Sequence, residues 1–507
     1  MTDAPAAAIV LEGVTRRFGA LTAVDAVSLV IPRGEVFAIV GENGAGKSTL
    51  MNVVYGIHRA DAGTIRVRGE AVSFRSPADA IEAGIGMVHQ HFTLVRTLTV
   101  AENVSLGDEP VRGAWTFDRR ASEEKVKALA KDLGFTIDPR ALVGDLPVGG
   151  QQRVEILKSL SRGAETLLLD EPTAVLTPQE SDELFAVLRR LAAQGKSVVF
   201  VSHKLQEVMA VSSRVAVMRA GRLTAQLDTA TTTAKDIARE MVGRDPEPLP
   251  PKAAALPGAP VLVLEGVSAR DDRGLPALRD VSLEVRAGEI VGVAGVEGNG
   301  QAELVEVIAA LRPADAGAIR VLGRDARRAT PAQLLDGGLA HIPGDRLHRA
   351  VIAEMSVGEN VLLGRHRERR FSGALGLDRA AMAAEAARVA EALDVRPRDP
   401  SVPLGSLSGG NQQKAVVGRE LGRAPKLLLA DHPTRGVDVG AIERIHAAIL
   451  AERARGVGVL LVTADLGELL ALADRVVVLY GGRIAHRVDA SATDERALGP
   501  HMTGAGA

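Results

Sequence analysis

Residues 41–48 read Gly-Glu-Asn-Gly-Ala-Gly-Lys-Ser, and this stretch decides the fold of the half of the chain that contains it. The apolar run at 35–40 before it is typical of a buried parallel strand, and residues 49–54 after it indicate the start of a helix. Glycines let the backbone curl so that its N–H groups and the positive end of the helix face a polyphosphate. The pattern therefore predicts a loop that binds a nucleoside triphosphate.

Two side chains at the end of this loop have specific roles in such a site. Lys47 is expected to reach the β- and γ-phosphates, and the Ser48 hydroxyl is expected to bind Mg²⁺. An ordinary glycine-rich turn is the alternative, but it does not call for the strand, the helix, the lysine and the serine together. The residues expected to contact the nucleotide here are Gly41, Glu42, Asn43, Gly44, Ala45, Gly46, Lys47, Ser48 and Thr49.

Length and composition narrow the class of protein. A chain of 507 residues is too long for one hydrophobic core, so two or more domains are expected. The net charge of −2 argues against a broadly basic nucleic-acid binder, and the absence of cysteine excludes disulfides and thiolate metal sites. The first residues lack the pattern of a signal peptide, and no apolar run approaches the roughly 18–20 residues of a membrane helix. We expect any contact with a membrane to be made through partners.

The two halves of the sequence repeat each other. The loop at 41–46 recurs at 295–300, and Thr-Val-Ala-Glu-Asn-Val at 99–104 recurs as Ser-Val-Gly-Glu-Asn-Val at 356–361. Repeats separated by more than 250 residues indicate duplicated domains rather than a solenoid. The proline-rich stretch at 245–260 is expected to be an extended linker. We therefore predict one domain at 1–244 and a second at 261–507.

Apolar runs alternate with amphipathic stretches within each half. In the first half, residues 166–170 and 197–201 have the composition of buried strands, and residues 181–191 between them have that of a helix. A strand, a helix and a strand at this spacing form a βαβ unit, which places the two strands in parallel. The sequence therefore predicts an α/β fold with mainly parallel sheets.

Further candidate residues follow the predicted strands of the first half. Asp170 and Glu171 end one strand, where Asp170 could hold Mg²⁺ and Glu171 could orient or deprotonate an attacking water. His203 ends the next strand and could bond the γ-phosphate, although a histidine there could equally be structural. Gln90 follows another apolar segment and offers an amide to Mg²⁺ or to the water. Phe18 could stack on adenine, with core packing as the alternative.

Together with Leu-Ser-Gly-Gly-Asn-Gln-Gln at 407–413, these motifs resemble the ATP-binding subunit of an ABC transporter, in the family's order and over essentially the whole chain. The resemblance implies two tandem P-loop nucleotide-binding domains with ATP and Mg²⁺ as cofactors. It also implies that a signature motif in each domain contacts the γ-phosphate held by the other domain, by the same helix-terminus chemistry. In the second half this signature consists of Ser408, Gly409, Gly410 and Asn411.

The resemblance also implies that the two composite sites differ. Site one, formed by the first-half motifs and the second-half signature, has every polar role filled. Site two lacks the loop lysine, the hydroxyl, the catalytic carboxylate and most of its signature. We therefore expect hydrolysis at site one only; His432 acting as a base at site two is the alternative. The replacements at site two are Gln301, Ala302, Gly344, His432, Ala464, Pro147 and Val148.

Tandem halves without membrane spans resemble importers of simple sugars and nucleosides. In these, one such chain lies at the cytoplasmic face of the membrane and serves two integral-membrane permease subunits, to which an extracytoplasmic substrate-binding protein delivers the cargo. Residues 87–95, 241–244, 298–301 and 433–438 favour this branch, and details at 89–92 and 298–301 favour nucleosides. No nucleic-acid partner is expected.

Two other functions stay open at this point. A soluble tandem ATPase acting on ribosomes or nucleic acid is the first, but the relatives of that kind carry a long charged helical insert and two intact sites. A nucleotide sensor without turnover is the second, and the full set of catalytic residues at site one argues against it.

Overall fold

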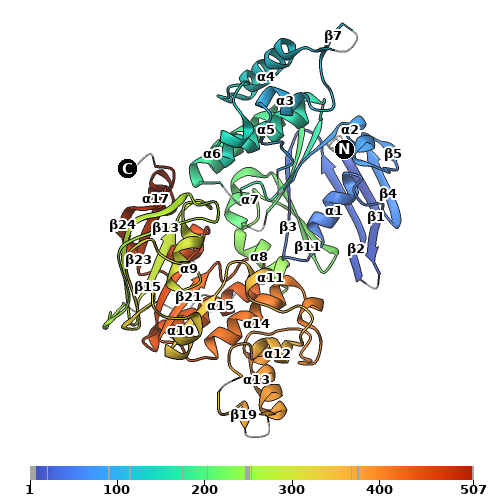
Figure 1. Ribbon diagram of the computed structural model, residues 1–507. Helices are drawn as coiled ribbons and strands as arrows, with labels where there is room; N and C mark the ends of the chain where they lie inside the picture. Colours follow the sequence, from blue (N-terminus) through green and yellow to red (C-terminus); the bar gives the residue numbers. More distant parts are fainter. Residues whose placement is uncertain are drawn as a thin grey trace. The chain divides into compact units, whose positions relative to one another are not determined.

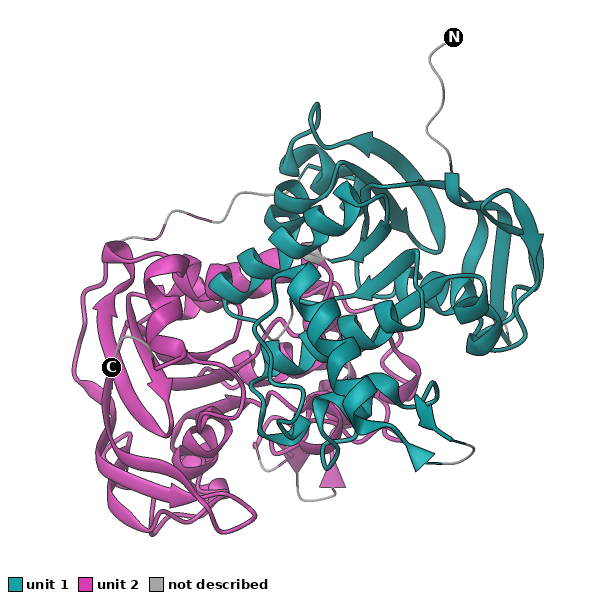
Figure 2. Cartoon of the chain, turned by 90° about the horizontal axis from the view of Figure 1, so that it is seen from above, with its two compact units in different colours: residues 1–246 teal, residues 247–507 magenta. Residues whose placement is uncertain are grey.

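The computed structural model describes residues 7–19, 21–89, 92–113, 116–173, 176–202, 204–245, 250, 252, 254–366, 368–373 and 376–504. The chain divides into two compact units, Met1–Pro246 and Glu247–Ala507, here called unit 1 and unit 2. Figure 2 colours them separately. In unit 2, residues 254–258, ahead of its first strand, belong to no helix or strand.

Unit 1 is built around a six-stranded sheet in the order β12-β11-β3-β10-β9-β6. The strands from β11 to β6 pair in parallel, and β12 adds an antiparallel edge. The predicted βαβ unit is confirmed, because β9 and β10 are parallel neighbours joined through α6. The strands are β3 (Val36–Gly41), β6 (Ile85–Val88), β9 (Thr166–Asp170), β10 (Ser197–Val201), β11 (Arg214–Arg219) and β12 (Arg222–Asp228).

A second, antiparallel sheet in the order β2-β1-β4-β5 completes the strand layer of unit 1 (Figure 1). It was not foreseen from the sequence. In β2, Val27, Leu29 and Ile31 are buried and the residues between them are exposed, which is the pattern of a sheet with one solvated face. The strands are β1 (Ala7–Phe18), β2 (Leu21–Pro32), β4 (Ala62–Val67) and β5 (Glu70–Val72); the small hairpin is β7 (Val111–Arg112) and β8 (Thr116–Phe117).

The helices of unit 1 cover the parallel sheet, and α3, α4 and α5 pack on one another as a separate helical layer (Figure 1). Among the described residues of the whole chain, none of the helices combines the length and apolar character needed to cross a bilayer. The helices of unit 1 are α1 (Lys47–Val54), α2 (Pro77–Glu82), α3 (Val100–Ser105), α4 (Arg119–Leu133), α5 (Val148–Ser161), α6 (Pro178–Ala193), α7 (Leu205–Val211) and α8 (Ala234–Val242).

Unit 2 repeats this architecture strand for strand. Its parallel sheet has the order β18-β21-β22-β15-β23-β24, and its antiparallel sheet has the order β14-β13-β16-β17. The strands are β13 (Pro260–Arg270), β14 (Pro276–Arg286), β15 (Ile290–Ala294), β16 (Ala316–Val321), β17 (Arg324–Asp325), β18 (Leu339–Ile342), β19 (Ser372–Gly373), β20 (Gly376–Leu377), β21 (Leu427–Asp431), β22 (Gly458–Val462), β23 (Arg475–Tyr480) and β24 (Arg483–Asp489).

The helices of unit 2 take the same places, with α12, α13 and α14 forming its helical layer. The parallel sheet is buried on both faces: Ile290 and Ala294 of β15 enter one hydrophobic cluster, whereas Val291 and Val293 enter another. The helices are α9 (Gln301–Ile308), α10 (Pro331–Gly337), α11 (Arg346–Arg349), α12 (Val357–Val361), α13 (Arg379–Ala392), α14 (Gly409–Leu421), α15 (Val439–Ala454), α16 (Leu466–Leu472) and α17 (Glu495–Met502).

The repeated Glu-Asn motif has one structural role in both units. Asn103 is fully buried, accepts a hydrogen bond from the Val95 N–H at 2.8 Å, and donates its amide to backbone carbonyls of the preceding loop. Asn360 does the same with Ile352, at 2.9 Å. Each asparagine therefore satisfies backbone groups that no helix or strand pairs, which fixes the loop that enters the helical layer.

Replacing Asn103 by alanine should lower the free energy of unfolding by about 2–4 kcal/mol, because it leaves several buried backbone groups without a partner. Urea unfolding followed by circular dichroism measures this change. The control is Glu124→Ala, which removes only a surface ion pair with Arg120 and should cost less than about 1 kcal/mol. Equal small effects for the two variants would contradict the role assigned to Asn103.

Candidate phosphate-binding and metal site

The glycine-rich loop joins β3 to α1 at the carboxyl end of the parallel sheet (Figure 1). Gly41 ends β3, residues 42–45 form the turn, Gly46 precedes α1, and Lys47, Ser48 and Thr49 lie in its first turn. Gly46 has a φ of 97°, and a Cβ there would lie 2.3 Å from the Ala23 carbonyl oxygen. Only glycine fits this position, so the curled path of the loop is dictated by its sequence.

Lys47 lies inside the loop. Its side chain is buried, and Nζ donates hydrogen bonds to the carbonyl oxygens of Gly41 at 2.8 Å and Glu42 at 3.0 Å. Burial lowers the pKa of Lys47, while the charges of Glu171, Asp170 and Glu42 oppose that shift. The ammonium group thus lies where the carboxylates and the loop carbonyls meet, close to the amides that would receive a phosphate.

Asp170 ends β9 and offers an open coordination position. Its side chain is buried, and within the described part of the chain Oδ1 has no hydrogen-bond partner. Burial raises the pKa of Asp170, and interaction with the Ser48 hydroxyl partly opposes this. A buried carboxylate oxygen beside a hydroxyl is the kind of hard oxygen donor set that Mg²⁺ prefers. The residues present therefore fit a magnesium ion bound with a nucleotide phosphate.

Glu171 follows directly and has an unusual backbone. Its φ is 47°, in the left-handed region that only a few per cent of non-glycine residues adopt, and its N–H donates to the Val201 carbonyl at 3.0 Å. Such strain persists where the surrounding structure fixes it, and it is common at functional sites. Here it turns the chain sharply at the carboxyl end of β9, where α/β sheets bind their ligands.

Phe18 lies at the end of β1 and is 40% exposed, so the alternative that it packs in the core is wrong. The Arg16 guanidinium lies 4.7 Å from the ring centroid, and His58 contacts the ring edge-on at 5.2 Å. The ring is therefore free on the solvent side to stack on a planar group. Gln90 and His203 lie outside the described residues, so their roles remain predictions.

The signature residues of unit 2 begin α14. Ser408 is the N-cap residue, and among the described residues no side chain caps the first turn. The Asn411 side chain instead donates to Ser408 Oγ at 3.0 Å and accepts from the Arg396 N–H at 2.9 Å. The helix start, with Gly409 and Gly410, therefore offers backbone amides to an anion, and contact of this signature with ATP stays a prediction.

Sequence reasoning missed Arg346. Its guanidinium donates to the Gln412 side chain at 3.2 Å, and Nη2 lies 2.6 Å from where a Cβ of Gly409 would be. Burial and the neighbouring Arg435 lower its pKa. A half-buried cation against the start of α14 adds to the attraction for an anion. The available signal was the Gly-Asp-Arg sequence at 344–346, in the segment that corresponds to Gln90.

The glycine-rich loop of unit 2 has a similar backbone conformation, but one of its side chains bonds the backbone groups of the loop itself. Gly300 has a φ of 107°, close to that of Gly46. The Gln301 side chain, at the position of Lys47, accepts from the Asn299 N–H at 3.1 Å and donates to the Val296 carbonyl at 3.0 Å. It therefore engages a loop amide that could otherwise face a phosphate, and it brings no charge.

Asp431, the carboxylate at the end of β21 in unit 2, is also bonded by residues of its own unit. Asp431 Oδ1 lies 2.6 Å from His432 Nδ1, and Oδ2 accepts from the Gly344 N–H at 3.0 Å. Among the described residues, Asp170 Oδ1 has no partner, whereas both oxygens of Asp431 are bonded within unit 2. His432 has a φ of 46° and so retains the left-handed backbone of Glu171. Its imidazole is held by the carboxylate beside it.

Comparison with known proteins agrees with this architecture. The ABC transporter family model matches residues 24–174 and 278–435, one segment in each unit. The chain belongs to the ABC transporter family.

Relatives align along almost the full length of this ABC protein. A glucose import ATP-binding protein of Haloferax volcanii is 45% identical, covering 98% of this chain and 96% of the relative. A guanosine import ATP-binding protein of Bacillus subtilis is 44% identical, with 98% and 97% covered. A nucleoside import ATP-binding protein of Lactococcus lactis is 42% identical, with 97% of each covered. The chain is thus an ABC ATPase with two cassettes, and the predicted fold class is confirmed.

Asp170→Asn should stabilise the nucleotide-free ABC protein at neutral pH. Because the folded-state pKa of Asp170 is raised, the native state disfavours the carboxylate, and stability is lost as pH rises from the ordinary value of 3.8 through the raised pKa. The asparagine variant has no such penalty, so its melting temperature should exceed that of the wild type at pH 7. The difference should vanish as pH falls below 4. Thermal unfolding across this range, without magnesium or nucleotide, measures it; a lower melting temperature for the variant at pH 7 would contradict it.

Proposed function

We propose that this chain is the ATP-hydrolysing subunit of an importer for a nucleoside or a simple sugar, with a nucleoside favoured. The names of its relatives support import, and two of the three relatives described above are named for guanosine or nucleosides. Residues 298–301 and 89–92 add to the nucleoside preference from sequence resemblance. No residue of an ATPase subunit needs to touch the cargo, so this preference rests on family likeness.

The proposal includes one hydrolytic site per chain. The observation that carries it is the contrast between the two strand-end aspartates: Asp170 keeps an open buried oxygen, whereas Asp431 is tied to His432 and Gly344. The two loops differ in the same way: the loop of unit 1 contains the charged Lys47, whereas the loop of unit 2 has the neutral Gln301 at this position. Loss of a cation and of a catalytic carboxylate removes several kcal/mol of transition-state stabilisation. Unit 1 therefore supplies the reactive phosphate loop.

Each residue of this site has a proposed task. The loop amides and Lys47 hold the β- and γ-phosphates, and Glu171 orients the attacking water and accepts its proton. Bound magnesium, held by Ser48, Asp170 and Gln90, would neutralise charge between the phosphates. His203 would bond the γ-phosphate, and Phe18 would stack on the adenine. The signature of unit 2 would complete the site with Ser408, Gly409, Gly410 and Asn411.

Glu171→Gln tests the site assignment. The amide cannot accept the proton of the attacking water, so we expect ATP turnover to fall at least about a hundredfold while ATP still binds. His432→Gln is the matched control, because it changes the corresponding left-handed residue of unit 2 and should leave turnover within about twofold. Steady-state phosphate release and nucleotide binding measure both effects. Turnover that survives Glu171→Gln, or that is lost in His432→Gln, would refute the single-site proposal.

A permease partner has a candidate docking place in unit 1. A cavity of about 140 Å³ lies between α2, β6 and α5, and its lining includes Ile81, Met87, His89 and Ser159. Thr93, also in the lining, is fixed by Glu155, to which it donates a backbone N–H at 2.5 Å. The cavity therefore borders the segment that carries Gln90. A partner inserted there would respond when nucleotide moves that segment.

We further propose that the chain lies at the cytoplasmic face of the membrane, peripherally, and serves two integral-membrane permease subunits. An extracytoplasmic binding protein would deliver the cargo to these permeases. ATP adds contacts to both cassettes in the closed state only, so binding favours closure and hydrolysis favours reopening. The alternative, action on ribosomes or nucleic acid, has no observation in its favour in the described structure.

Co-purification distinguishes these partners. The chain, tagged and extracted from membranes in mild detergent, should bring two hydrophobic permease subunits with it. Ser159→Phe should release them by filling the cavity, while ATP binding by the chain alone persists. Ser213→Phe, a partly exposed serine of unit 1 outside the cavity, is the control. Recovery of ribosomes or RNA instead of permeases would overturn the importer proposal.

A further inference from the structure

Unit 2 contains a cavity that the ATP chemistry does not use. It has a volume of about 380 Å³ and lies between α13 and α14 of the helical layer and the neighbouring helix α15. This volume lies in the range of pockets that take small organic molecules. Its apolar lining includes Val389, Leu393, Leu421 and Ala448.

Three arginines line the same cavity: Arg388 of α13, Arg444 of α15, and Arg455, which directly follows α15. Their side chains are 42–58% exposed, so they lie towards solvent rather than in the core. Each forms an ion pair, with Glu385, Asp394 and Glu452 respectively.

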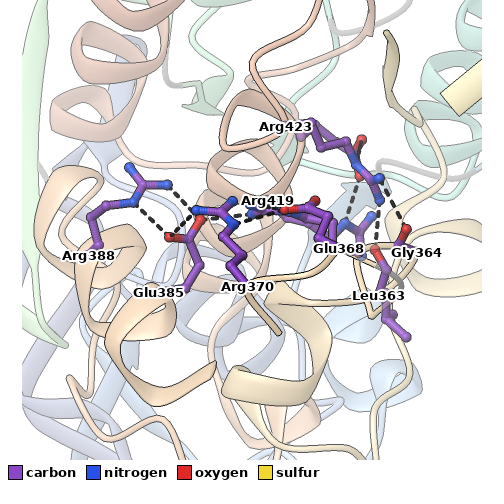
Figure 3. Close-up of polar contacts among 10 residues, drawn as sticks. Leu363, Gly364, Glu368, Arg370, Glu385, Arg388, Arg419 and Arg423 are labelled. Carbon is purple, nitrogen blue, oxygen red and sulfur yellow. Dashed lines mark hydrogen bonds and ion pairs between the residues drawn. The ribbon is translucent and has the colours of Figure 1, made fainter. Parts of the chain in front are cut away.

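The carboxylates of the first two pairs are shared among several cations. Glu385 contacts Arg365 at 2.8 Å, Arg388 at 2.9 Å and Arg370 at 3.7 Å (Figure 3). The hydrogen bond from Arg388, together with Arg365, holds the pKa of Glu385 below its ordinary value despite burial. In Figure 3, Arg388 lies at one end of this network, where two of its nitrogens donate hydrogen bonds to the Glu385 carboxylate.

Asp394 is shared in the same way, by Arg396 at 3.1 Å, Arg444 at 3.3 Å and Arg398 at 3.6 Å. Arg388 and Arg444 therefore each share their carboxylate with two further arginines. Ion pairs exposed to this degree contribute little to stability, so an anionic ligand can compete for these guanidinium groups.

The interior of the cavity departs from the corresponding place in unit 1. There Leu157 of α5 and Leu191 of α6 are both completely buried. Unit 2 has Gly418 and Glu452 at these positions. Val389 Cγ1 occupies the place of a Gly418 side chain, at 2.3 Å from where its Cβ would be. The two leucines that are buried at these positions in unit 1 are thus absent from unit 2, and the residues that replace them, Gly418 and Glu452, line the cavity.

Burying the carboxylate of Glu452 is unfavourable, and packing alone does not account for it. Its residue surface is only 6% exposed, and burial raises its pKa although Arg455 lies 2.5 Å away. A buried ion pair generally stabilises a protein no better than well-packed apolar side chains do. A cavity lined by apolar side chains together with a buried carboxylate and three half-exposed arginines has the chemistry of a binding site rather than of a core.

We propose that the cavity between α13, α14 and α15 binds a small amphipathic organic anion. Its apolar body would lie on Val389, Leu421 and Ala448, and its carboxylate, sulfonate or phosphate group would bond Arg388 and Arg444. The ligand would contact the carboxyl-terminal end of α14, through Leu421 and Gly422, whereas the signature lies at the other end of that helix. The site is separate from the phosphate loop and needs no nucleotide.

Two fluorescent probes of equal shape test this proposal on the full chain. One is 8-anilinonaphthalene-1-sulfonate, an amphipathic anion, and the other is N-phenyl-1-naphthylamine, the same molecule without the sulfonate. Titrations in saturating ATP and EDTA keep the nucleotide site out of the signal. We expect one saturable site for the anion and weaker binding of the neutral probe.

Substitutions then separate shape from charge. Ala448→Trp and Ala392→Trp, from opposite walls, should abolish saturable binding of both probes while circular dichroism stays unchanged. Ala392 is exposed, so its variant remains testable if Ala448→Trp does not fold. Arg444→Gln should weaken the anion about tenfold and the neutral probe less than about twofold. Arg328→Gln, an exposed arginine of unit 2 outside the cavity, is the control and should change neither.

Three results would overturn the proposal. The first is unchanged anion binding in a folded tryptophan variant. The second is an equal loss of both probes in Arg444→Gln, which would mean that no charge is recognised. The third is an equal effect of Arg328→Gln and Arg444→Gln, which would mean that the anion responds only to overall charge.

Discussion

The carboxylate of Asp170 is the group on which the proposed difference in function between the two units depends. It is buried at the end of a parallel strand, and one of its oxygens has no partner in the described part of the chain. That arrangement is unfavourable in the empty protein and becomes favourable when a cation enters. Asp431 is the same residue on the same strand end, but a histidine and a backbone amide already bond it. One unit thus keeps an unsatisfied group for a ligand, and the other has satisfied it internally.

Both units have the same fold although their site residues differ, because the residues that set the backbone path are not those that would contact a nucleotide. The curl of both loops comes from glycines with φ near 100°, and the sheets are held by buried aliphatic strands in both units. The charge of Lys47 contributes nothing to either. Replacing it by Gln301 leaves the loop in place, since the amide bonds the loop itself. Unit 2 therefore keeps this architecture without the loop lysine.

Much of this structure could be predicted from local sequence. The phosphate loop and the βαβ unit follow from glycine spacing and from short apolar runs, and the α/β class was right. The antiparallel sheet was missed, because β2 buries alternate residues and both long strands contain polar ones. Arg346 was missed because it lies beside Gly409 in the fold, although the two residues are more than 60 positions apart in the sequence. The cavity beside Glu452 could not be predicted from the sequence of any one helix, since α13, α14 and α15 form it together.

The left-handed residue after each strand-end aspartate has a consequence for engineering. His432 keeps, at φ of 46°, the backbone turn that Glu171 makes at 47°. A glutamate introduced there would inherit the required main-chain geometry without remodelling. If unit 2 lacks a hydrolytic site, as proposed, its differences from unit 1 at this strand end are consequently side-chain exchanges, which a designer could reverse stepwise.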